Sequence, residues 1–263
     1  MIERPYLVIE VRVGHDGEHL AACTCRWLQQ QIGKKLADST ARYYLALSGG
    51  STPQRLYALL AELPADQIDW TGVVLIWGDE RNVPPDHADS NFRMVQQTLL
   101  SKIEIPPENI LGVPNPGGPA EQAAAEYEQR LRAVLPCDAS GRWPRLDCVL
   151  LGLGDDAHTA SLFPQTAALQ EQDRWCVANF VPKLNTWRIT LTAPAINAAA
   201  NVAFLIAGEK KTDALRALWH GPAAPDLVPS QLIRPTDGVL WFFVDSAALD
   251  GVDPPVAPRR CEG

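Results

Sequence analysis

Short apolar runs recur along the chain, and several of them carry no polar residue at alternate positions. Uninterrupted apolar runs are typical of strands that are buried on both faces, as in a parallel sheet. The runs predict strands at Tyr6–Val13, Tyr44–Leu47, Val73–Trp77, Leu146–Leu151, Arg188–Leu191, Val202–Ala207 and Val239–Val244.

The segments between these runs repeat apolar residues at spacings of three and four, which is the period of a helix with one buried face. Ala124, Tyr127, Leu131 and Val134 follow this spacing. The pattern predicts helices at Gly17–Ala37, Pro53–Glu62, Asn91–Lys102, Ala120–Leu135 and Glu209–Trp219. Alternating strands and helices indicate an α/β fold with a mainly parallel sheet and helices on both faces, a Rossmann-like three-layer sandwich.

The length of the chain, 263 residues, is sufficient for one large core. We therefore expect a single domain over residues 1–263, with an ordered core at about 5–248. Pro106–Pro119 is rich in proline and glycine, but the strand–helix alternation resumes on both sides, so we interpret it as a surface loop. We expect the tail after Asp250 to be frayed.

The net charge of −8 argues against binding to nucleic acid or to an anionic membrane through the overall field of the protein. An anionic ligand would need a local cluster of cations. The first residues, MIERPYLVIEVRV, carry charges among their apolar positions and do not form a secretory signal. No apolar run reaches the length of a membrane span. We therefore expect a cytoplasmic protein.

Cysteine spacing gives no sign of a metal site or a disulfide framework. The six cysteines include no CxxC pair, and the closest two, Cys23 and Cys25, lie within a predicted helix. The sequence therefore favours buried, reduced thiols over disulfides or zinc. The six positions are Cys23, Cys25, Cys137, Cys148, Cys176 and Cys261.

A glycine-rich loop follows the strand predicted at Tyr44–Leu47. Its residues are Ser48, Gly49, Gly50, Ser51 and Thr52, and a helix is predicted to begin at Pro53. Glycines let the backbone approach a ligand closely, and free N–H groups at a helix start attract an anion. The loop lacks the lysine of a Walker motif and is not GxGxxG, so a small phosphate ester fits better than a nucleotide. The alternative is a tight turn that only caps the helix.

Three consecutive charged residues follow the strand predicted at Val73–Trp77 after a single glycine: Asp79, Glu80 and Arg81. The carboxyl ends of parallel strands are where such folds bind ligands, so we expect Asp79 and Arg81 to face the substrate. Arg81 can bind phosphate bidentately. The alternative is a structural ion pair between Arg81 and one of the two acids. We interpret His87 as a loop residue.

The segment Leu151–Pro164, LGLGDDAHTASLFP, carries the strongest catalytic signal. A buried strand ends in two glycines, and Asp156 and His158 follow two residues apart. A carboxylate beside a histidine can orient the imidazole and raise its basicity, as a general base requires. The alternative is a turn in which the aspartate caps a helix and the histidine is exposed.

Basic residues also lie at two further predicted strands. Lys211 follows Val202–Ala207, Arg188 is the first residue of the strand at Arg188–Leu191, and Lys183 precedes that strand. The alternative for Lys210 and Lys211 is that they are solvated lysines at a helix start. Taken together, the motifs predict one cleft that binds a small phosphorylated molecule.

These motifs resemble those of 6-phosphogluconolactonases. The matching segments are SGGSTP at Ser48–Pro53, GDERNVP at Gly78–Pro84, GLGDDAHTASLFP at Gly152–Pro164, RITLT at Arg188–Thr192 and GEKK at Gly208–Lys211. The resemblance covers roughly residues 5–245. It implies a fold similar to that of glucosamine-6-phosphate deaminase and ribose-5-phosphate isomerase. It also implies hydrolysis of 6-phosphoglucono-δ-lactone in the oxidative pentose phosphate pathway, without a cofactor or a metal.

The resemblance also assigns roles to residues. The family's histidine matches His158, which would be the general base, and its aspartate matches Asp156. The phosphate loop matches Gly49 to Thr52, and the cationic contacts match Arg81, Arg188 and Lys211. One position departs from the family pattern, because Ala157 stands where glycine is usual. If this position requires a positive φ, alanine costs about 1 kcal/mol there.

Two other functions compete with this interpretation. An amino-sugar phosphate deaminase on the same fold has a glutamate five residues after the histidine, where this chain has Phe163. Such deaminases also tend to be oligomers, and nothing in this sequence suggests one, so we expect a monomer. A non-catalytic phosphosugar sensor would keep the cleft but would have no need for the pair Asp156 and His158.

Overall fold

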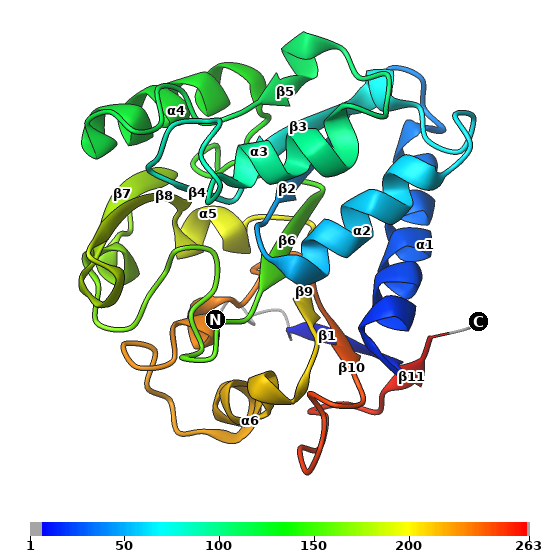
Figure 1. The fold of residues 1–263 in the computed structure, drawn as a ribbon, viewed down its shortest axis with the longest axis vertical. Coiled ribbons are helices and arrows are strands. Elements are labelled where there is room, and N and C mark those ends of the chain that lie inside the picture. The colour runs from blue at the N-terminus through cyan, green and yellow to red at the C-terminus, as the bar shows by residue number, and fades with distance from the viewer. Residues whose placement is uncertain (1–6, 262–263) are drawn as a thin grey trace.

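The computed structural model describes residues 7–261. A sheet of eight strands forms the centre of the fold (Figure 1). Every neighbouring pair of strands in this sheet is parallel. The predicted α/β fold with a mainly parallel sheet is therefore confirmed. The spatial order is β11 (Arg259–Arg260), β1 (Val8–Gly14), β10 (Val239–Asp245), β9 (Asn201–Ile206), β6 (Cys148–Gly152), β2 (Tyr43–Leu47), β3 (Val73–Trp77) and β5 (Ile110–Leu111).

The centre of this sheet is buried on both faces, which explains the uninterrupted apolar runs. Leu45 in β2 and Leu75 in β3 pair with each other and are fully buried. All five residues of β3 are buried. Neither face of the sheet meets solvent at these positions, so the strands appear in the sequence as uninterrupted apolar runs.

A second, smaller sheet has three antiparallel strands in the order β4 (Asp79–Arg81), β8 (Thr186–Leu191) and β7 (Cys176–Val181). The strand predicted at Arg188–Leu191 exists, but it lies in this sheet and not in the parallel one. A short turn at Pro182–Leu184 joins β7 to β8, and a connection this short reverses the chain direction. Because β4 begins two residues after β3 ends, the small sheet adjoins the large one.

Helices pack around the large sheet (Figure 1). Their bounds are α1 (Gly17–Leu36), α2 (Ser51–Glu62), α3 (Asn91–Val95), α4 (Ala120–Val134), α5 (Ala193–Asn197) and α6 (Thr212–His220). The helix predicted at Asn91–Lys102 is α-helical only as far as Val95, and a π-helical turn follows at Gln96–Leu100. In that turn the Thr98 hydroxyl donates to the Met94 carbonyl, a local bond that competes with the α-helical pattern.

The predicted apolar face of α4 is largely correct. Ala124, Tyr127 and Leu131 are buried, but Val134 is 40% exposed, since it is the last residue of the helix. The Tyr127 hydroxyl accepts a hydrogen bond from the Trp77 N–H and donates one to the Trp77 carbonyl. This side chain therefore fixes the end of β3 next to the predicted ligand-binding residues.

The segment Pro106–Pro119, which we interpreted as a surface loop, contains secondary structure. Ile110 and Leu111 form β5 and pair with Leu75 and Ile76 of β3. A strand of two residues is too short to produce a periodic pattern, so the sequence does not reveal it.

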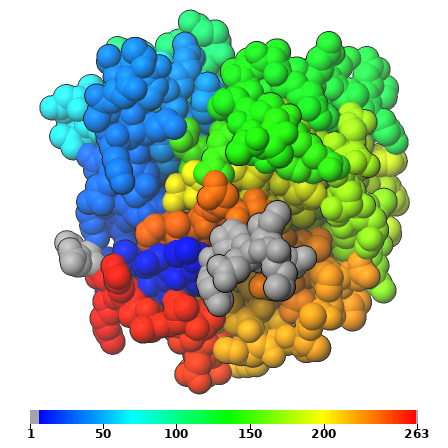
Figure 2. All heavy atoms as spheres, turned by 180° about the vertical axis from the view of Figure 1, so that it is seen from behind, coloured from blue at the N-terminus to red at the C-terminus, as the bar shows by residue number. Residues whose placement is uncertain are grey.

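The C-terminal tail, which we expected to be frayed, pairs with the N-terminal strand β1. Arg259 and Arg260 form β11 and pair with Arg12 and Val13 of β1. Figure 2 shows these C-terminal residues in red against the dark blue N-terminal strand. Residues 1–6, which include the start of the strand predicted at Tyr6–Val13, lie outside the described residues.

A disulfide joins Cys23 in α1 to Cys261 at the end of the tail, so the expectation of reduced thiols throughout was wrong for this pair. The two residues lie 238 positions apart, and only the pairing of β11 with β1 brings them together. Cys25, Cys148 and Cys176 are buried free thiols as expected, whereas Cys137 is free and exposed. Burial raises the pKa of Cys25 to about 11 and keeps its thiol protonated.

Candidate active site

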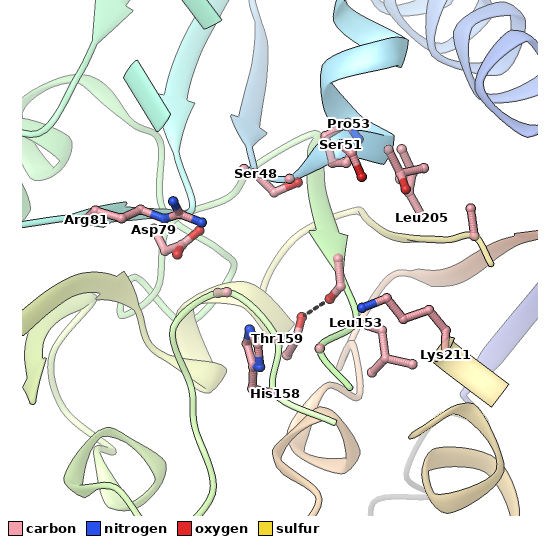
Figure 3. A pocket seen from close by; sticks show the side chains of 17 residues that line it. Ser48, Ser51, Pro53, Asp79, Arg81, Leu153, His158, Thr159, Leu205 and Lys211 are labelled. Atoms are coloured by element: carbon pink, nitrogen blue, oxygen red, sulfur yellow. Dashed lines mark hydrogen bonds between the residues drawn. The ribbon is translucent and has the colours of Figure 1, made fainter. Parts of the chain in front are cut away.

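The predicted ligand-binding residues meet at the carboxyl ends of four neighbouring strands. Ser48, Gly49 and Gly50 form the loop after β2, whereas Ser51 and Thr52, which we expected in this loop, are the first two residues of α2. Asp79 and Arg81 lie just beyond β3, in β4. The turn at 153–158 follows β6, and Lys211 follows β9. Because the sheet order is β9, β6, β2, β3, these four ends adjoin one another. Figure 3 shows His158 and Lys211 across the pocket from Ser48 and Ser51.

Two adjoining pockets contain all of the predicted site residues. The first is lined by the predicted residues Ser48, Gly49, Gly50, Ser51, Thr52, Asp79, Arg81, His158 and Lys211. The second shares Asp79, Arg81, His158 and Lys211 with the first and adds Asp156 and Arg188. His87 lies outside both pockets and is exposed, as expected of a loop residue.

The segment Ser48–Thr52 needs both of its glycines. Gly50 has φ of +104°, a conformation that residues with a side chain rarely adopt, and a Cβ on Gly49 would lie 2.0 Å from Asn91 Oδ1. The loop backbone is fixed by the buried Tyr57 hydroxyl, which accepts from the Ser48 N–H and donates to the Ser48 carbonyl. No side chain of the described residues caps the first turn of α2, which leaves its N–H groups for an anion.

His158 and Asp156 form a close pair. His158 Nδ1 lies 2.5 Å from Asp156 Oδ1, and this contact holds the pKa of Asp156 well below its usual range. Lys183 Nζ donates to the other carboxylate oxygen at 2.8 Å and contributes to the same effect. Because Nδ1 is engaged, Nε2 is the ring nitrogen left for a ligand. The alternative of an isolated, exposed histidine is not what the structure has.

The conformation of the turn that carries this pair is restrained by its backbone and by neighbouring side chains. Ala157 has φ of +59°, so the position where the family usually has glycine does adopt the left-handed conformation. The Gly154 N–H donates to the His158 carbonyl at 2.8 Å, and a Cβ on Gly154 would lie 1.9 Å from His158 Nδ1. Phe163 stacks on the imidazole, with ring centroids 4.0 Å apart. Backbone and aromatic contacts together fix the ring.

Two arginines lie side by side on neighbouring strands of the small sheet. Arg81 of β4 pairs in register with Arg188 of β8. Burial, and secondarily the charge of Arg81, lowers the pKa of Arg188. Within residues 7–261 the buried Nε atom of each guanidinium has no hydrogen-bond partner, and neither arginine forms an ion pair. Two partly buried guanidiniums with no ion pair in the described chain, each with a free Nε donor, are a site for an anionic or polar oxygen ligand.

The structural alternative for Arg81, a pair with Asp79 or Glu80, is not realised. Arg81 donates instead to the Asp89 carbonyl at 2.8 Å. Glu80 accepts from the backbone N–H groups of Asn91 and Phe92 at the start of α3, both at 2.7 Å. Glu80 is therefore a capping residue, whereas Asp79 remains directed toward the pockets.

Asp79 and Lys211 are each held by a neighbour. Asp79 is 7% exposed and accepts from the Ser161 hydroxyl at 2.6 Å. Lys211 Nζ lies 2.5 Å from Asp155 Oδ1, and this contact lowers the pKa of Asp155. Lys211 is therefore not the freely solvated lysine of the alternative interpretation. Its position in both pockets leaves it close to any bound ligand.

The sequence did not assign a role in the pockets to three residues that shape them. Ser161 and Phe163 lie inside the segment Leu151–Pro164, so their nearness to His158 was a usable signal. Lys183 was noted only as additional positive charge, because its contact with Asp156 spans 27 positions. Residues 7–261 hold no cluster of His, Cys, Asp or Glu side chains arranged to bind a metal ion. Across the same residues, every helix is too short or too polar to serve as a membrane span.

Residues 15–242 match the sequence profile of a family described as glucosamine-6-phosphate isomerases/6-phosphogluconolactonase. The chain belongs to this family. A relative named 6-phosphogluconolactonase from Nostoc sp. is 47% identical over 208 residues, which cover 79% of this chain and 83% of the relative. Another protein of that name, from Synechocystis sp., is 41% identical and covers 77% of this chain and 82% of the relative.

Solved structures show the same architecture. A 6-phosphogluconolactonase from Leishmania guyanensis superposes with a TM-score of 0.84 at 28% identity, covering 94% of this chain and all of the other. A monomeric glucosamine-6-phosphate deaminase superposes with a TM-score of 0.75 at 19% identity, covering 93% of this chain and all of the other. At that identity the second match shows a shared fold alone.

Proposed function

We propose that this protein hydrolyses 6-phospho-D-glucono-1,5-lactone to 6-phosphogluconate, a reaction of the oxidative pentose phosphate pathway. The observation that carries the proposal is the contact between Asp156 and His158 Nδ1 in a pocket that also contains an anion-binding loop. The names of the relatives from Nostoc and Synechocystis support the same substrate. The expected partner is thus a small phosphorylated sugar lactone.

In the proposed mechanism, His158 is the general base. Its Nε2 takes a proton from a water molecule as the water oxygen attacks the C1 carbonyl of the lactone. Asp156 fixes the tautomer of the ring and stabilises the imidazolium that forms. When the bond between C1 and the ring oxygen breaks, the imidazolium returns the proton to that oxygen. The products are a carboxylic acid and a free hydroxyl, so no covalent intermediate is needed.

The phosphate of the substrate serves as a remote anchor in this mechanism. The uncapped N–H groups at the start of α2 and the cation Lys211 both line the first pocket, where they can bind it. Arg81 and Arg188 line the second pocket, and the Nε atom of each, which has no partner among residues 7–261, is a donor for phosphate or for the oxyanion that develops at C1. An anchor at a distance from C1 positions the carbonyl for attack.

The first test compares wild type with His158→Ala on freshly prepared lactone. Product formation is followed with a coupled 6-phosphogluconate dehydrogenase, and the spontaneous opening of the lactone is subtracted. We expect the variant to lose at least about 100-fold in kcat, as is typical for a general base, with a circular dichroism spectrum like that of wild type. Equal turnover in the two proteins would contradict the proposed base.

The deaminase alternative is weakened by Phe163. This side chain stacks on His158 with an interplanar angle of 17°, so an aromatic ring occupies the position where deaminases of this fold carry a glutamate. Ammonia release from glucosamine 6-phosphate, without lactone hydrolysis, would reverse this conclusion. Tight binding of 6-phosphogluconate with no turnover of the lactone would instead indicate a sensor.

The proposal includes a monomer located in the cytoplasm. The disulfide between Cys23 and Cys261 bears on location, because the reducing cytosol normally keeps such pairs open. Size-exclusion chromatography with light scattering tests the oligomeric state. Thiol labelling of rapidly quenched cells, followed by peptide mass analysis, tests whether this pair is oxidised where the protein resides.

A further inference from the structure

The carboxylate of Asp156 is held on both of its oxygens. Oδ1 lies 2.5 Å from His158 Nδ1, and Oδ2 accepts a hydrogen bond from Lys183 Nζ at 2.8 Å. The backbone N–H of His158 adds a longer contact of 3.4 Å to Oδ1. Lys183 therefore touches the charge that orients His158, although it does not touch the imidazole itself.

Lys183 reaches this carboxylate from a different part of the chain. It lies in the turn at Pro182–Leu184, between β7 and β8 of the small sheet. Asn185 ends the turn in the left-handed conformation, with φ of +47°, and its N–H donates to the Pro182 carbonyl at 3.1 Å. The tip of this hairpin thus has a defined shape that presents Lys183 to the catalytic turn.

The ion pair contributes little to the stability of the fold. The Lys183 side chain is 68% exposed, and exposed ion pairs stabilise proteins only weakly. Asp156, in contrast, is only 23% exposed and lies against the proposed base. The consequence of the contact therefore lies in the chemistry of His158 and not in folding.

Within the proposed function, we propose that Lys183 is a positioning residue for the general base. It holds Asp156 by its second oxygen and offsets part of the negative charge that Asp156 presents to His158. Without this offset the carboxylate would stabilise the imidazolium more strongly. An imidazolium cannot take a proton from water, so Lys183 keeps His158 available as a base to lower pH.

Several other charged groups line the second pocket beside this pair. Asp155 is paired with Lys211, and Asp79 accepts from Ser161. Arg81 and Arg188 line the second pocket together with Lys183. In the described part of the chain, Lys183 is the only lysine or arginine that forms an ion pair with Asp156. Loss of Lys183 therefore removes the one lysine or arginine that this carboxylate contacts among residues 7–261.

The test is the pH profile of kcat/KM for lactone hydrolysis in wild type, Lys183→Met and Lys183→Arg. We expect the acidic limb of the Lys183→Met profile to move upward by about half a pH unit, which lowers activity on that limb about threefold. Lys183→Arg keeps the positive charge and should restore the wild-type limb. Lys210→Met, which removes an exposed lysine from the neighbouring turn at Glu209–Lys211, is the matched control and should leave the limb unchanged.

A second measurement does not need turnover. The imidazole resonances of His158, assigned by their absence in His158→Ala, are followed by NMR during a pH titration of wild type and Lys183→Met. We expect the titration midpoint of His158 to rise in the variant. An unchanged midpoint and pH profile, or a rise in KM alone, would overturn the role of Lys183. A wild-type protein without lactone hydrolysis would instead overturn the proposed function.

Discussion

At the scale of single residues, Asp156 makes two contacts of different origin, one with His158 in the same turn and one with Lys183 of the small sheet. Asp156 and His158 lie two positions apart, so their pairing follows from the local turn. The contact between Lys183 and Asp156 spans 27 positions and depends on how the small sheet packs against the large one. The sequence left open whether Arg81 is a structural or a ligand-binding residue. The answer depends on whether the Glu80 carboxylate pairs with Arg81 or caps α3, which the sequence does not show.

Ala157 supplies a prediction about backbone conformation. At φ of +59°, a β-branched side chain is far more strained than alanine, whereas glycine is free of strain. We expect Ala157→Val to lower the free energy of unfolding by at least about 2 kcal/mol and to reduce turnover, because it displaces His158. Ala157→Gly should stay within about 1 kcal/mol of wild type, since relief of strain is offset by loss of a buried methyl and a more flexible unfolded chain.

Urea unfolding and lactone turnover of the two Ala157 variants give the comparison. Equal stability of the valine and glycine variants would mean that position 157 does not hold the left-handed conformation in solution. Ala157→Gly is the matched control, because it changes the same backbone position without adding bulk.

At the scale of elements, strand length and burial decided what could be predicted. β2 and β3 are buried on both faces and were identified from their apolar runs, with bounds within one residue. Three strands have only two or three residues each, too few to show a periodic pattern of apolar residues: β4, β5 and β11. Each is a strand because it pairs with a neighbouring strand. β7 was missed because its exposed and buried residues do not alternate regularly.

Tyr57 carries a prediction at this scale, because it connects α2 to the end of β2. Its hydroxyl satisfies both the N–H and the carbonyl of Ser48, each at 2.9 Å. Tyr57→Phe leaves two buried backbone groups without this partner, so we expect a loss of about 1–3 kcal/mol in the free energy of unfolding. We also expect KM for the lactone to rise, because the glycine loop that begins at Ser48 loses its support.

The control for this variant is Tyr44→Phe, whose hydroxyl forms no hydrogen bond with any residue between 7 and 261. It should change neither stability nor KM appreciably. Denaturant titration and steady-state kinetics measure both quantities. An unchanged KM in Tyr57→Phe would show that the loop keeps its shape without the hydroxyl.

At the scale of the whole molecule, the disulfide between Cys23 and Cys261 links the first helix, α1, to the last described residue. A cross-link over 238 positions restricts the unfolded chain, so we expect Cys261→Ser to lower the free energy of unfolding by about 2–5 kcal/mol. Turnover should persist, because β11 is separated from β9 by β1 and β10.

Unfolding in urea with and without a dithiol reductant checks this prediction, and non-reducing peptide mass analysis confirms the bond. Cys137→Ser, which replaces an exposed free thiol, is the control and should be neutral. A Cys261→Ser protein as stable as wild type would mean that the bond does not form in solution. The sequence did not reveal the bond, since it depends on the pairing of β11 with β1.

The two outermost strands of the large sheet, β11 and β5, have a consequence for solubility. Each is only two residues long, and β11 consists of Arg259 and Arg260, which are exposed. An open strand edge is a template on which other chains can add, and short or charged outer strands prevent such addition. The tail thus shields the long edge of β1 from aggregation. A protein shortened before residue 259 would lose this shield while keeping its pocket.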